Sequence, residues 1–503
     1  MWEEHLGPIR CVVEHRNVGG DRGPTLRVYD QRAERELLRF DCFERTPHFH
    51  IDPGGKNRVT PLSPQEDTIE VVLEELGRDL EGYLKRAGLE LPRPLDRAAV
   101  TALLERAQAE MRNPPVDLDA IELSELRRRE GEKWSHYPPD VLPAWVADMD
   151  FPVPDPVRRA LLAAVERSDV GYSLEPWKTG LCEAFVERMQ ERFDWTVDPG
   201  RIEILTDVVQ GIYVGLEAFT QPEEGVVIQT PVYPPFLQAI RETGRRMITN
   251  PLVQGSKRYE IDLDGLRNAV DASTRVLLLC NPHNPSGRVF SRGELESIAE
   301  VVVENDLVVI SDEIHQDLLF EGARHVPFAV LGPEVEARTI TLTSASKTFS
   351  IAGLRCAIAA FGSEGLKERF LGIPRHLRGG IGSMGMQATL AAWQHGQPWL
   401  ERVLVHLRAN RDHVAQFVGR RWPRVVHFPP EATYLSWLDF RALELPGGPA
   451  RFFFERARVA LSNGKFFGPE GVGFARLNFA TSRPILDQVL DRMDEALSGD
   501  RPG

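Results

Sequence analysis

The chain has 503 residues, of which 42% are hydrophobic, so it is long enough for about three globular domains with sizeable cores. Its formal net charge of -14 argues against a nucleic-acid partner, because phosphate backbones bind positively charged surfaces. No segment approaches the roughly eighteen apolar residues of a membrane span, and the acidic start MWEEHLGPIR lacks the apolar region of a signal peptide. We therefore expect a cytoplasmic protein. The cysteines are scattered and odd in number, which predicts reduced thiols: Cys11, Cys42, Cys182, Cys280 and Cys356.

Residues 1–112 predict a small α+β domain of unassigned function. Strand-like segments and two helical patterns follow one another in the ranges 9–15, 25–30, 36–43, 67–88 and 95–112, with a turn-rich stretch at 17–24. Residues 113–133 contain a proline pair and then charged residues, which predicts a linker or an arm lying across another surface. A module that presents a carrier-bound or peptide-bound substrate, or that mediates assembly, is one hypothesis for residues 1–112.

A possible metal site lies in the alternating stretch HFHID of this domain. His48, His50 and Asp52 would share one face of a strand. No cysteine or further histidine stands at a ligand-like spacing, so the polar face of an edge strand is the favoured interpretation. We predict no metal.

Short apolar runs alternate with helical stretches from about residue 200 to 362, and polar residues follow the runs directly. GVVIQT precedes PVYPP, RVLLLC precedes NPHNPSG, LVVI precedes SDEIH, and TITLT precedes SASK. Apolar runs of this length suit strands buried on both faces, and helices between them predict a mostly parallel sheet in an α/β fold. Ligands bind outside the carboxyl ends of such strands, so the four segments are expected to meet at one cleft.

Lys347 is the leading candidate for a catalytic residue. Ser344 stands three residues before it and Arg355 eight residues after it. A hydroxyl and a guanidinium could thus reach one phosphate dianion while the amine forms a Schiff base with pyridoxal phosphate. Taken alone, a lysine after an apolar strand is more often a solvated surface residue.

Three further residues offer what this cofactor needs. Asp312 follows a buried strand, where its carboxylate needs a partner such as a protonated pyridine nitrogen; a helix N-cap is the alternative. Asn284 would donate to the phenolic oxygen, unless it forms an ordinary Asx turn. Tyr233 would stack on the ring, although an aromatic between prolines is more often packing.

A helix beginning after Thr206 would bind the cofactor phosphate. Its first amides, around Asp207, Val208 and Val209, point out of the helix N-terminus, where anions bind.

In this order along the chain, these residues resemble the fold type I pyridoxal-phosphate enzymes of the class I/II aminotransferase superfamily, over roughly residues 125–498. The resemblance implies that Arg476, in GFARLNFA, binds the substrate α-carboxylate; a surface arginine is the alternative. It also implies that Tyr172 reaches the phosphate of a partner subunit's cofactor, in a homodimer with shared active sites. It implies a segment 134–171, a large domain 172–398 and a small α+β domain 399–498.

Four longer stretches are similar to the MalY/PatB-type cystathionine β-lyases, also called cysteine-S-conjugate β-lyases: 133–154, 311–318, 431–443 and 466–483. This branch has His315 where many aminotransferases have tyrosine. The resemblance adds His315 and Ser346 to the cofactor-binding residues and Ala147 to the substrate-binding residues.

The implied reaction is cleavage of L-cystathionine or a cysteine S-conjugate to a thiol, pyruvate and ammonia. Lys347 would be both the Schiff-base anchor and the base for the α-proton. An aminotransferase for an amino acid or a specialised metabolite is the first alternative, and a catalytically inactive binding or assembly protein is the second. Extra polar groups near the pocket, Asn463, Lys465, Arg375 and Arg378, would select an anionic substrate or be solvated loop residues, the second being favoured.

Overall fold

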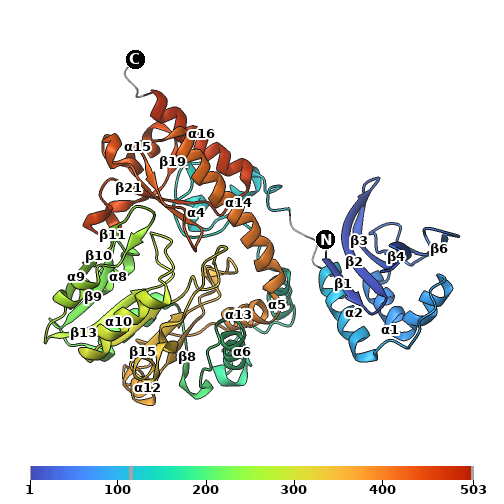
Figure 1. Cartoon of the computed structure of the whole chain (residues 1–503), viewed down its shortest axis with the longest axis horizontal. Coiled ribbons are helices and arrows are strands. Elements are labelled where there is room, and N and C mark those ends of the chain that lie inside the picture. The colour runs from blue at the N-terminus through green and yellow to red at the C-terminus, as the bar shows by residue number, and fades with distance from the viewer. Residues whose placement is uncertain (1, 113–116, 500–503) are drawn as a thin grey trace. The chain divides into compact units, whose positions relative to one another are not determined.

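The structure is a computed structural model that describes residues 2–112 and 117–499. The chain divides into two compact units, Met1–Asp117 and Leu118–Gly503. Figure 1 shows the first unit in blue and the second in the colours from cyan to red. Among the described residues, no helix has both the length and the apolar character needed to cross a bilayer.

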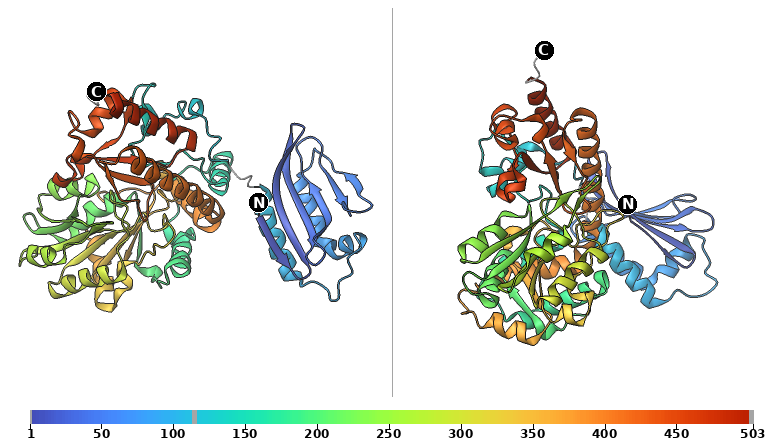
Figure 2. Two further views of the ribbon diagram at one scale, coloured as in Figure 1. Left: turned by 45° about the horizontal axis from the view of Figure 1, so that its top comes forward. Right: turned by 60° about the vertical axis from the view of Figure 1, so that its left-hand side comes forward.

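The first unit is an antiparallel sheet with two helices. The six strands pair in chain order: β1 (Trp2–Leu6), β2 (Ile9–Val18), β3 (Asp21–Asp30), β4 (Arg35–Asp41), β5 (His48–Ile51) and β6 (Arg58–Pro61). Helices α1 (Thr68–Arg86) and α2 (Arg97–Arg112) cover one face, where strand residues such as Val28 and Phe40 pack against Leu76 and Leu103 (Figure 2). The predicted α+β domain is confirmed. The stretch 17–24 is mostly strand, because only Gly19 and Gly20 form the turn, both with positive φ.

The second unit is built on a seven-stranded sheet. Its order is β10 (Arg246–Pro251), β9 (Gly225–Thr230), β13 (Thr274–Cys280), β14 (Val308–Asp312), β15 (Thr339–Thr343), β16 (Ala357–Phe361) and β8 (Ile202–Leu205). The first five strands are parallel, and β16 runs antiparallel to both of its neighbours. The mostly parallel sheet is therefore confirmed, and all its parallel strands point their carboxyl ends to one edge.

Helices cover both faces of this sheet. Val226 and Ile228 of β9 pack with α7 (Val208–Phe219), α8 (Pro234–Glu242) and α12 (Glu364–Leu371). Val227 points the other way, toward α9 (Leu263–Ala269) and α10 (Arg292–Glu304). This alternation on a strand buried on both faces explains why the sequence shows a continuous apolar run. Three further helices pack beside the β8 end: α5 (Asp155–Glu166), α6 (Leu181–Phe193) and α13 (Ser383–His395).

The C-terminal part of the second unit is a smaller α+β layer. Its sheet has the antiparallel order β17 (Val426–His427), β18 (Leu435–Asp439), β21 (Phe474–Asn478) and β20 (Ser462–Asn463). The helices are α14 (Gln397–Arg421), α15 (Pro449–Arg456) and α16 (Arg483–Gly499). In Figure 2 these orange and red elements lie at one end of the unit, beside the large sheet.

The segment that follows the first unit is part of this smaller layer. β7 (Leu142–Pro143) pairs in parallel with β19 (Val459–Ala460). Leu118, Ile121 and Leu126 are buried in the same core, so the described part of residues 113–133 is an arm packed on the second unit. Residues 113–116 lie outside the described residues.

The remaining short elements are α3 (Leu123–Leu126), α4 (Glu132–Ser135), α11 (Pro333–Glu336), β11 (Val253–Gln254), β12 (Tyr259–Glu260), and the 3-10 helices η1 (Pro176–Lys178), η2 (Pro199–Arg201), η3 (Phe328–Leu331), η4 (Ala352–Leu354), η5 (Arg441–Leu443), η6 (Gly464–Phe467) and η7 (Pro469–Gly471).

Candidate active site

Polar residues gather where the parallel strands end. Asp312 is the last residue of β14, Asn284 follows β13, and Tyr233 caps α8 just after β9. Lys347 lies four residues after β15. The parallel direction of these strands brings all four segments to the same edge of the sheet.

Lys347 is partly buried, and its amine contacts the loop that belongs to the small layer. Its Nζ donates to the backbone oxygen of Ala147 at 2.7 Å. Burial lowers the pKa of this amine, the positive charge of Arg476 lowers it further, and the carboxylates of Asp148 and Asp312 oppose the shift. The net shift favours a neutral amine, the form that can act as a nucleophile or base.

The loop that carries Ala147 is held by two groups that sequence reasoning missed. Tyr434 donates its hydroxyl to the Ala147 oxygen at 3.0 Å. Asn478 donates to the backbone oxygens of Val146 and Asp148, both at 2.7 Å. Asn478 lies two residues after Arg476 on β21, and the two-residue period of a strand places both side chains on one face. The sequence spacing could therefore have predicted that Asn478 faces the site. No pattern marks Tyr434, because a buried tyrosine is more often a packing residue.

Asp312 is a buried carboxyl with an unusual titration. Its Oδ1 accepts a hydrogen bond from the Ile314 amide at 3.0 Å. Burial raises the pKa of Asp312 to about 7, and the negative charge of Glu313 adds to the effect. Glu313 is itself held by His325, at 2.8 Å, in the interior behind the strand end. A carboxyl in such a place is stabilised as an anion when a cation lies against it.

Arg476 is a buried guanidinium that retains capacity for an anion. Nη1 donates to Asn284 Oδ1 at 2.9 Å, and Nη2 donates to Trp145 O at 3.0 Å and Ser462 Oγ at 3.1 Å. Its Nε is buried without a hydrogen-bond partner, and no carboxylate among the described residues pairs with it. Burial lowers the pKa of Arg476 to about 10. The bond to Asn284 Oδ1 leaves the Asn284 amide nitrogen as the donor for another group.

His315 and Tyr233 complete the interior of the site. Burial lowers the pKa of His315 to about 3, so its ring is neutral, and its Nδ1 is buried without a partner. The ring lies edge-on to Tyr434 at 6.2 Å between centroids. Burial raises the pKa of Tyr233, and the nearby charges of Arg476 and Asp312 act on it in opposite directions. These residues are therefore within electrostatic range of one another.

The predicted phosphate-binding residues lie at the start of α7. Val208 and Val209 are the first residues of the helix, and Asp207 caps it by accepting from the Gln210 amide at 2.8 Å. Arg355 donates to the other oxygen of Asp207 at 2.6 Å. A guanidinium beside the N-terminus of a helix is an arrangement that suits an anion, although Arg355 is here paired with the Asp207 carboxylate.

Ser344 lies three residues before Lys347, and its side chain is bound to backbone atoms. Its hydroxyl donates to Cys356 O at 2.6 Å and accepts from the Ser346 amide at 3.1 Å. In this conformation the hydroxyl proton is committed to Cys356, and a contact from Ser344 to a phosphate requires the hydroxyl to rotate.

The other predicted residues lie outside this interior. The side chain of Tyr172 is fully exposed to solvent in the single chain. Arg375 is exposed, whereas Arg378 is paired with Glu203 at 3.1 Å. Asn463 caps η6 through the Lys465 amide, and the Lys465 ammonium lies over the ring of Phe466. The contacts of Arg378, Asn463 and Lys465 are those of loop-stabilising residues.

The site suits pyridoxal 5'-phosphate. It offers a lysine amine with a lowered pKa, a buried carboxyl that gains from a cation, an aromatic at a strand end and a helix start suited to an anion. Together with the seven-stranded sheet and the smaller layer, this defines a fold type I pyridoxal-phosphate enzyme. The chain belongs to the family described as aminotransferase class I and II, which it matches over residues 150–493. Residues 5–111 match a domain of unknown function, DUF7700.

Three similar proteins place the chain within that family. The cystathionine beta-lyase PatB of Bacillus subtilis is 36% identical over 362 residues, which is 71% of this chain and 93% of PatB. Cystalysin from Treponema denticola, in a structure containing pyridoxal 5'-phosphate, is 30% identical with a TM-score of 0.72, covering 75% of this chain and 98% of cystalysin. A pyridoxal-phosphate-bound C-S lyase from Staphylococcus hominis is 29% identical with a TM-score of 0.72, covering 77% of this chain and all of the lyase. The chain is a pyridoxal-phosphate enzyme of the C–S lyase branch, acting on an amino-acid-type substrate.

Proposed function

We propose that the enzyme cleaves the Cβ–S bond of L-cystathionine or another cysteine S-conjugate and releases a thiol, pyruvate and ammonia. The observation that carries the proposal is that the Lys347 amine, whose pKa is lowered by burial and by Arg476, shares the site with an Arg476 guanidinium whose buried Nε has no hydrogen-bond partner. The first can move a proton at the substrate α-carbon, and the second can hold the α-carboxylate next to it. The names cystathionine beta-lyase and C-S lyase among its relatives favour elimination of sulfur.

In this proposal, the cofactor supplies the aldehyde that binds the substrate amine and the ring that withdraws electrons from the α-carbon. Asp312 would pair with the protonated ring nitrogen, whose charge would compensate the buried carboxylate. Asn284 would donate its amide hydrogens to the phenolic oxygen, and Tyr233 would pack on the ring. Arg355 and the amides of Val208 and Val209 would bind the phosphate, with Ser344 and Ser346 beside Lys347.

The chain's own residues then position the reacting atoms. Arg476 fixes the α-carboxylate through Nε and one Nη, which limits rotation about the Cα–N bond. Lys347 accepts the α-proton as a neutral amine, in line with its lowered pKa. The Ala147 oxygen, held by Tyr434 and Asn478, fixes the position of Nζ.

Product formation without a keto acid tests the reaction. Incubation with L-cystathionine should release pyruvate and thiol in equal amounts when no keto-acid acceptor is present. An aminotransferase, the second candidate that the family allows, would form product continuously only after a keto acid is added. That result would refute the lyase proposal.

We also propose that the enzyme is a homodimer in which Tyr172 serves the partner's site. Tyr172 is fully exposed, and large apolar side chains around it are exposed as well: Leu162, Val165, Val170, Leu174 and Trp177. Exposed apolar side chains gathered in one segment favour a subunit interface.

Mixing two inactive variants tests this arrangement. Tyr172→Ala and Lys347→Ala subunits, mixed and allowed to exchange, should regain about a quarter of wild-type activity, because random pairing gives half hybrids with one intact site each. Separate sites within each chain would give no recovery.

A further inference from the structure

We propose that the N-terminal unit binds a divalent transition-metal ion, represented by Zn²⁺, through Asp41, His48 and His50. The three offer ligand atoms that all lie within 4.8 Å of one another. The site lies in the unit that the lyase chemistry does not use. The proposal departs from the prediction of a polar strand face without a metal, and it names Asp41 in place of Asp52, which lies beyond the end of the strand.

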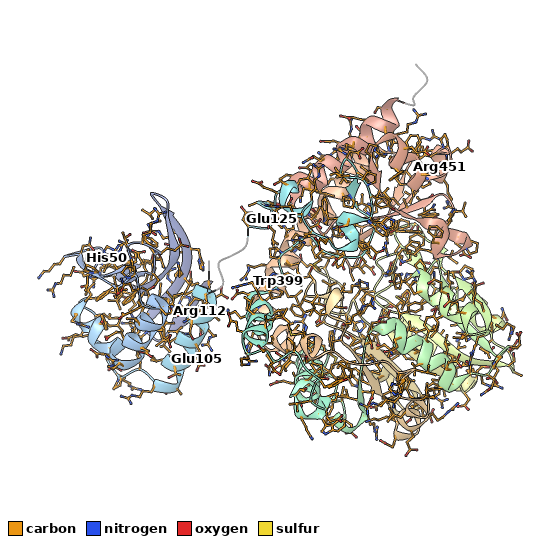
Figure 3. The ribbon with its side chains drawn as sticks, turned by 180° about the vertical axis from the view of Figure 1, so that it is seen from behind. His50, Glu105, Arg112, Glu125, Trp399 and Arg451 are labelled. Atoms are coloured by element: carbon orange, nitrogen blue, oxygen red, sulfur yellow. The ribbon has the colours of Figure 1, made fainter. Side chains whose placement is uncertain are left out.

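The strand register explains the replacement. Asp41 of β4 lies directly opposite His48 of β5, and His50 follows two residues later on the same face. Their neighbours Phe40 and Phe49 point to the helix-covered face. β5 is not an edge strand, because β6 pairs with its outer side. Figure 3 labels His50 on this sheet.

Asp52 leaves the strand instead of continuing it. β5 ends at Ile51, and Asp52 has a φ of 56° in the left-handed region. Its carboxylate pairs with Arg35 at 3.0 Å and accepts from the Lys56 amide. Strand alternation alone could not show this turn.

The distances from Asp41 Oδ2 to the two histidine nitrogens suit a tetrahedral ion. The Nε2 atoms of His48 and His50 lie 3.4 Å and 3.5 Å from Asp41 Oδ2. Zinc bonds of about 2.0–2.1 Å at tetrahedral angles separate neighbouring ligand atoms by roughly 3.3–3.4 Å. The observed separations exceed the roughly 2.7–3.2 Å of good hydrogen bonds.

Both imidazoles are held in the form that binds metals. His48 Nδ1 lies 2.7 Å from Thr46 O, which can only accept, so Nδ1 carries the hydrogen and Nε2 the lone pair of the neutral ring. His50 Nε2 lies 2.9 Å from an Arg39 nitrogen, which can only donate, so Nε2 again carries the lone pair. Its Nδ1 then donates to Asn57 Oδ1 at 2.7 Å. Such bonds to the second nitrogen orient metal-binding histidines.

Asp41 is oriented in the same way. It is nearly fully buried, and Thr25 donates to its Oδ1 at 2.6 Å, with Arg16 at 3.2 Å. These contacts fix one carboxylate oxygen and turn Oδ2 toward the two histidines. Three protein ligands leave a fourth position of a tetrahedral ion open to water or another small ligand.

The Arg39 guanidinium competes with an ion for two of the three ligand atoms. Its Nε donates to Asp41 Oδ2 at 3.1 Å, and its Nη2 donates to His50 Nε2. An incoming ion must displace it. Glu36 Oε2 stands 3.9 Å from Arg39 Nη1 and can pair with the displaced guanidinium, while Glu36 Oε1 stays bonded to Arg27. The side chain of Arg39 is 21% exposed, so it has a path to solvent. The arginine therefore weakens metal binding, and its removal should strengthen it.

Calorimetric titration of the full-length holoenzyme with ZnCl₂ tests the proposal. Arg39→Met should bind Zn²⁺ at least tenfold more tightly than the wild type, because the competing cation is gone. Asn57→Ala should bind about 10–100-fold more weakly, the usual effect of losing the group that orients a metal-binding histidine. The double variant His48→Ala/His50→Ala should lose this site.

Controls separate the site from adventitious binding. His5→Ala removes a histidine of the same sheet outside the cluster and should titrate like the wild type. Circular dichroism and cofactor absorbance show whether each variant is folded, and His48→Ala alone, at a partly exposed position, serves if the double variant unfolds. Zn²⁺ binding that survives loss of the histidines, or that is no tighter in Arg39→Met than in the wild type, would overturn the proposal.

Discussion

Replacing Arg476 by glutamine tests the substrate-binding half of the site. The guanidinium offers a buried, unpartnered Nε and two Nη groups that already bind Asn284, Trp145 and Ser462. Two charge-assisted hydrogen bonds to a carboxylate contribute about 1.5–3 kcal/mol each, so their loss costs about 3–6 kcal/mol. At about 1.4 kcal/mol per factor of ten, kcat/KM should fall roughly 10²–10⁴-fold.

The assay compares an acid with its amide. The wild type should release pyruvate or its amide far faster from S-methyl-L-cysteine than from S-methyl-L-cysteine amide, because only the acid can pair with Arg476. Arg476→Gln should slow the acid and leave the amide nearly unchanged, so that the preference collapses. Ser462→Ala is the matched control, since it removes one neutral partner of Arg476 and should cost no more than about tenfold. An Arg476→Gln enzyme that keeps the wild-type preference would refute the reasoning.

Three further variants probe the groups around Lys347. In the cofactor-free protein, the pKa of Asp312 is raised by burial from 3.8 to about 7, so the folded state holds a proton that the unfolded chain releases in this window. The free energy of unfolding therefore falls by about 4 kcal/mol as the pH rises from about 4 to 7. In urea unfolding, Asp312→Asn should remove this fall, and an equal pH dependence of stability in the variant and the wild type would contradict it. Asn478→Ala removes the hydrogen bonds to the backbone oxygens of Val146 and Asp148, so kcat should fall roughly 10–100-fold. Cofactor affinity, measured by titration, should stay unchanged, and an equal loss of affinity would argue against a positioning role. Tyr434→Phe keeps the ring but loses the hydrogen bond to the Ala147 oxygen, so kcat should fall up to about tenfold in the lyase assay, and an unchanged kcat would exclude that role.

The residues at the carboxyl edge of the large sheet could be predicted, because each strand and the polar residue after it are specified by a short stretch of sequence. The run 339–343 coincides with β15, and the run ending at Cys280 matches the end of β13. Parallel strands buried on both faces then oblige Asp312 and Asn284 to appear at one edge. The length of each short apolar run and the polar residue that follows it are therefore enough to predict most of the residues at this edge.

The groups that hold Lys347 could not be predicted in this way. Ala147 reaches the amine because β7 pairs with β19, more than 300 residues later in the chain. No local pattern specifies such a pairing. Likewise Asp41 joins His48 through strand register, while Asp52 is excluded by one left-handed residue at the end of β5.

Mapping the covalent attachment of the cofactor tests the central claim most directly. Borohydride reduction of the holoenzyme should convert the cofactor linkage to a stable secondary amine, and mass spectrometry of its peptides should find the added mass on Lys347. Lys347→Ala should carry no such adduct and release no pyruvate from L-cystathionine. An adduct on another lysine, or turnover retained by Lys347→Ala, would contradict the account.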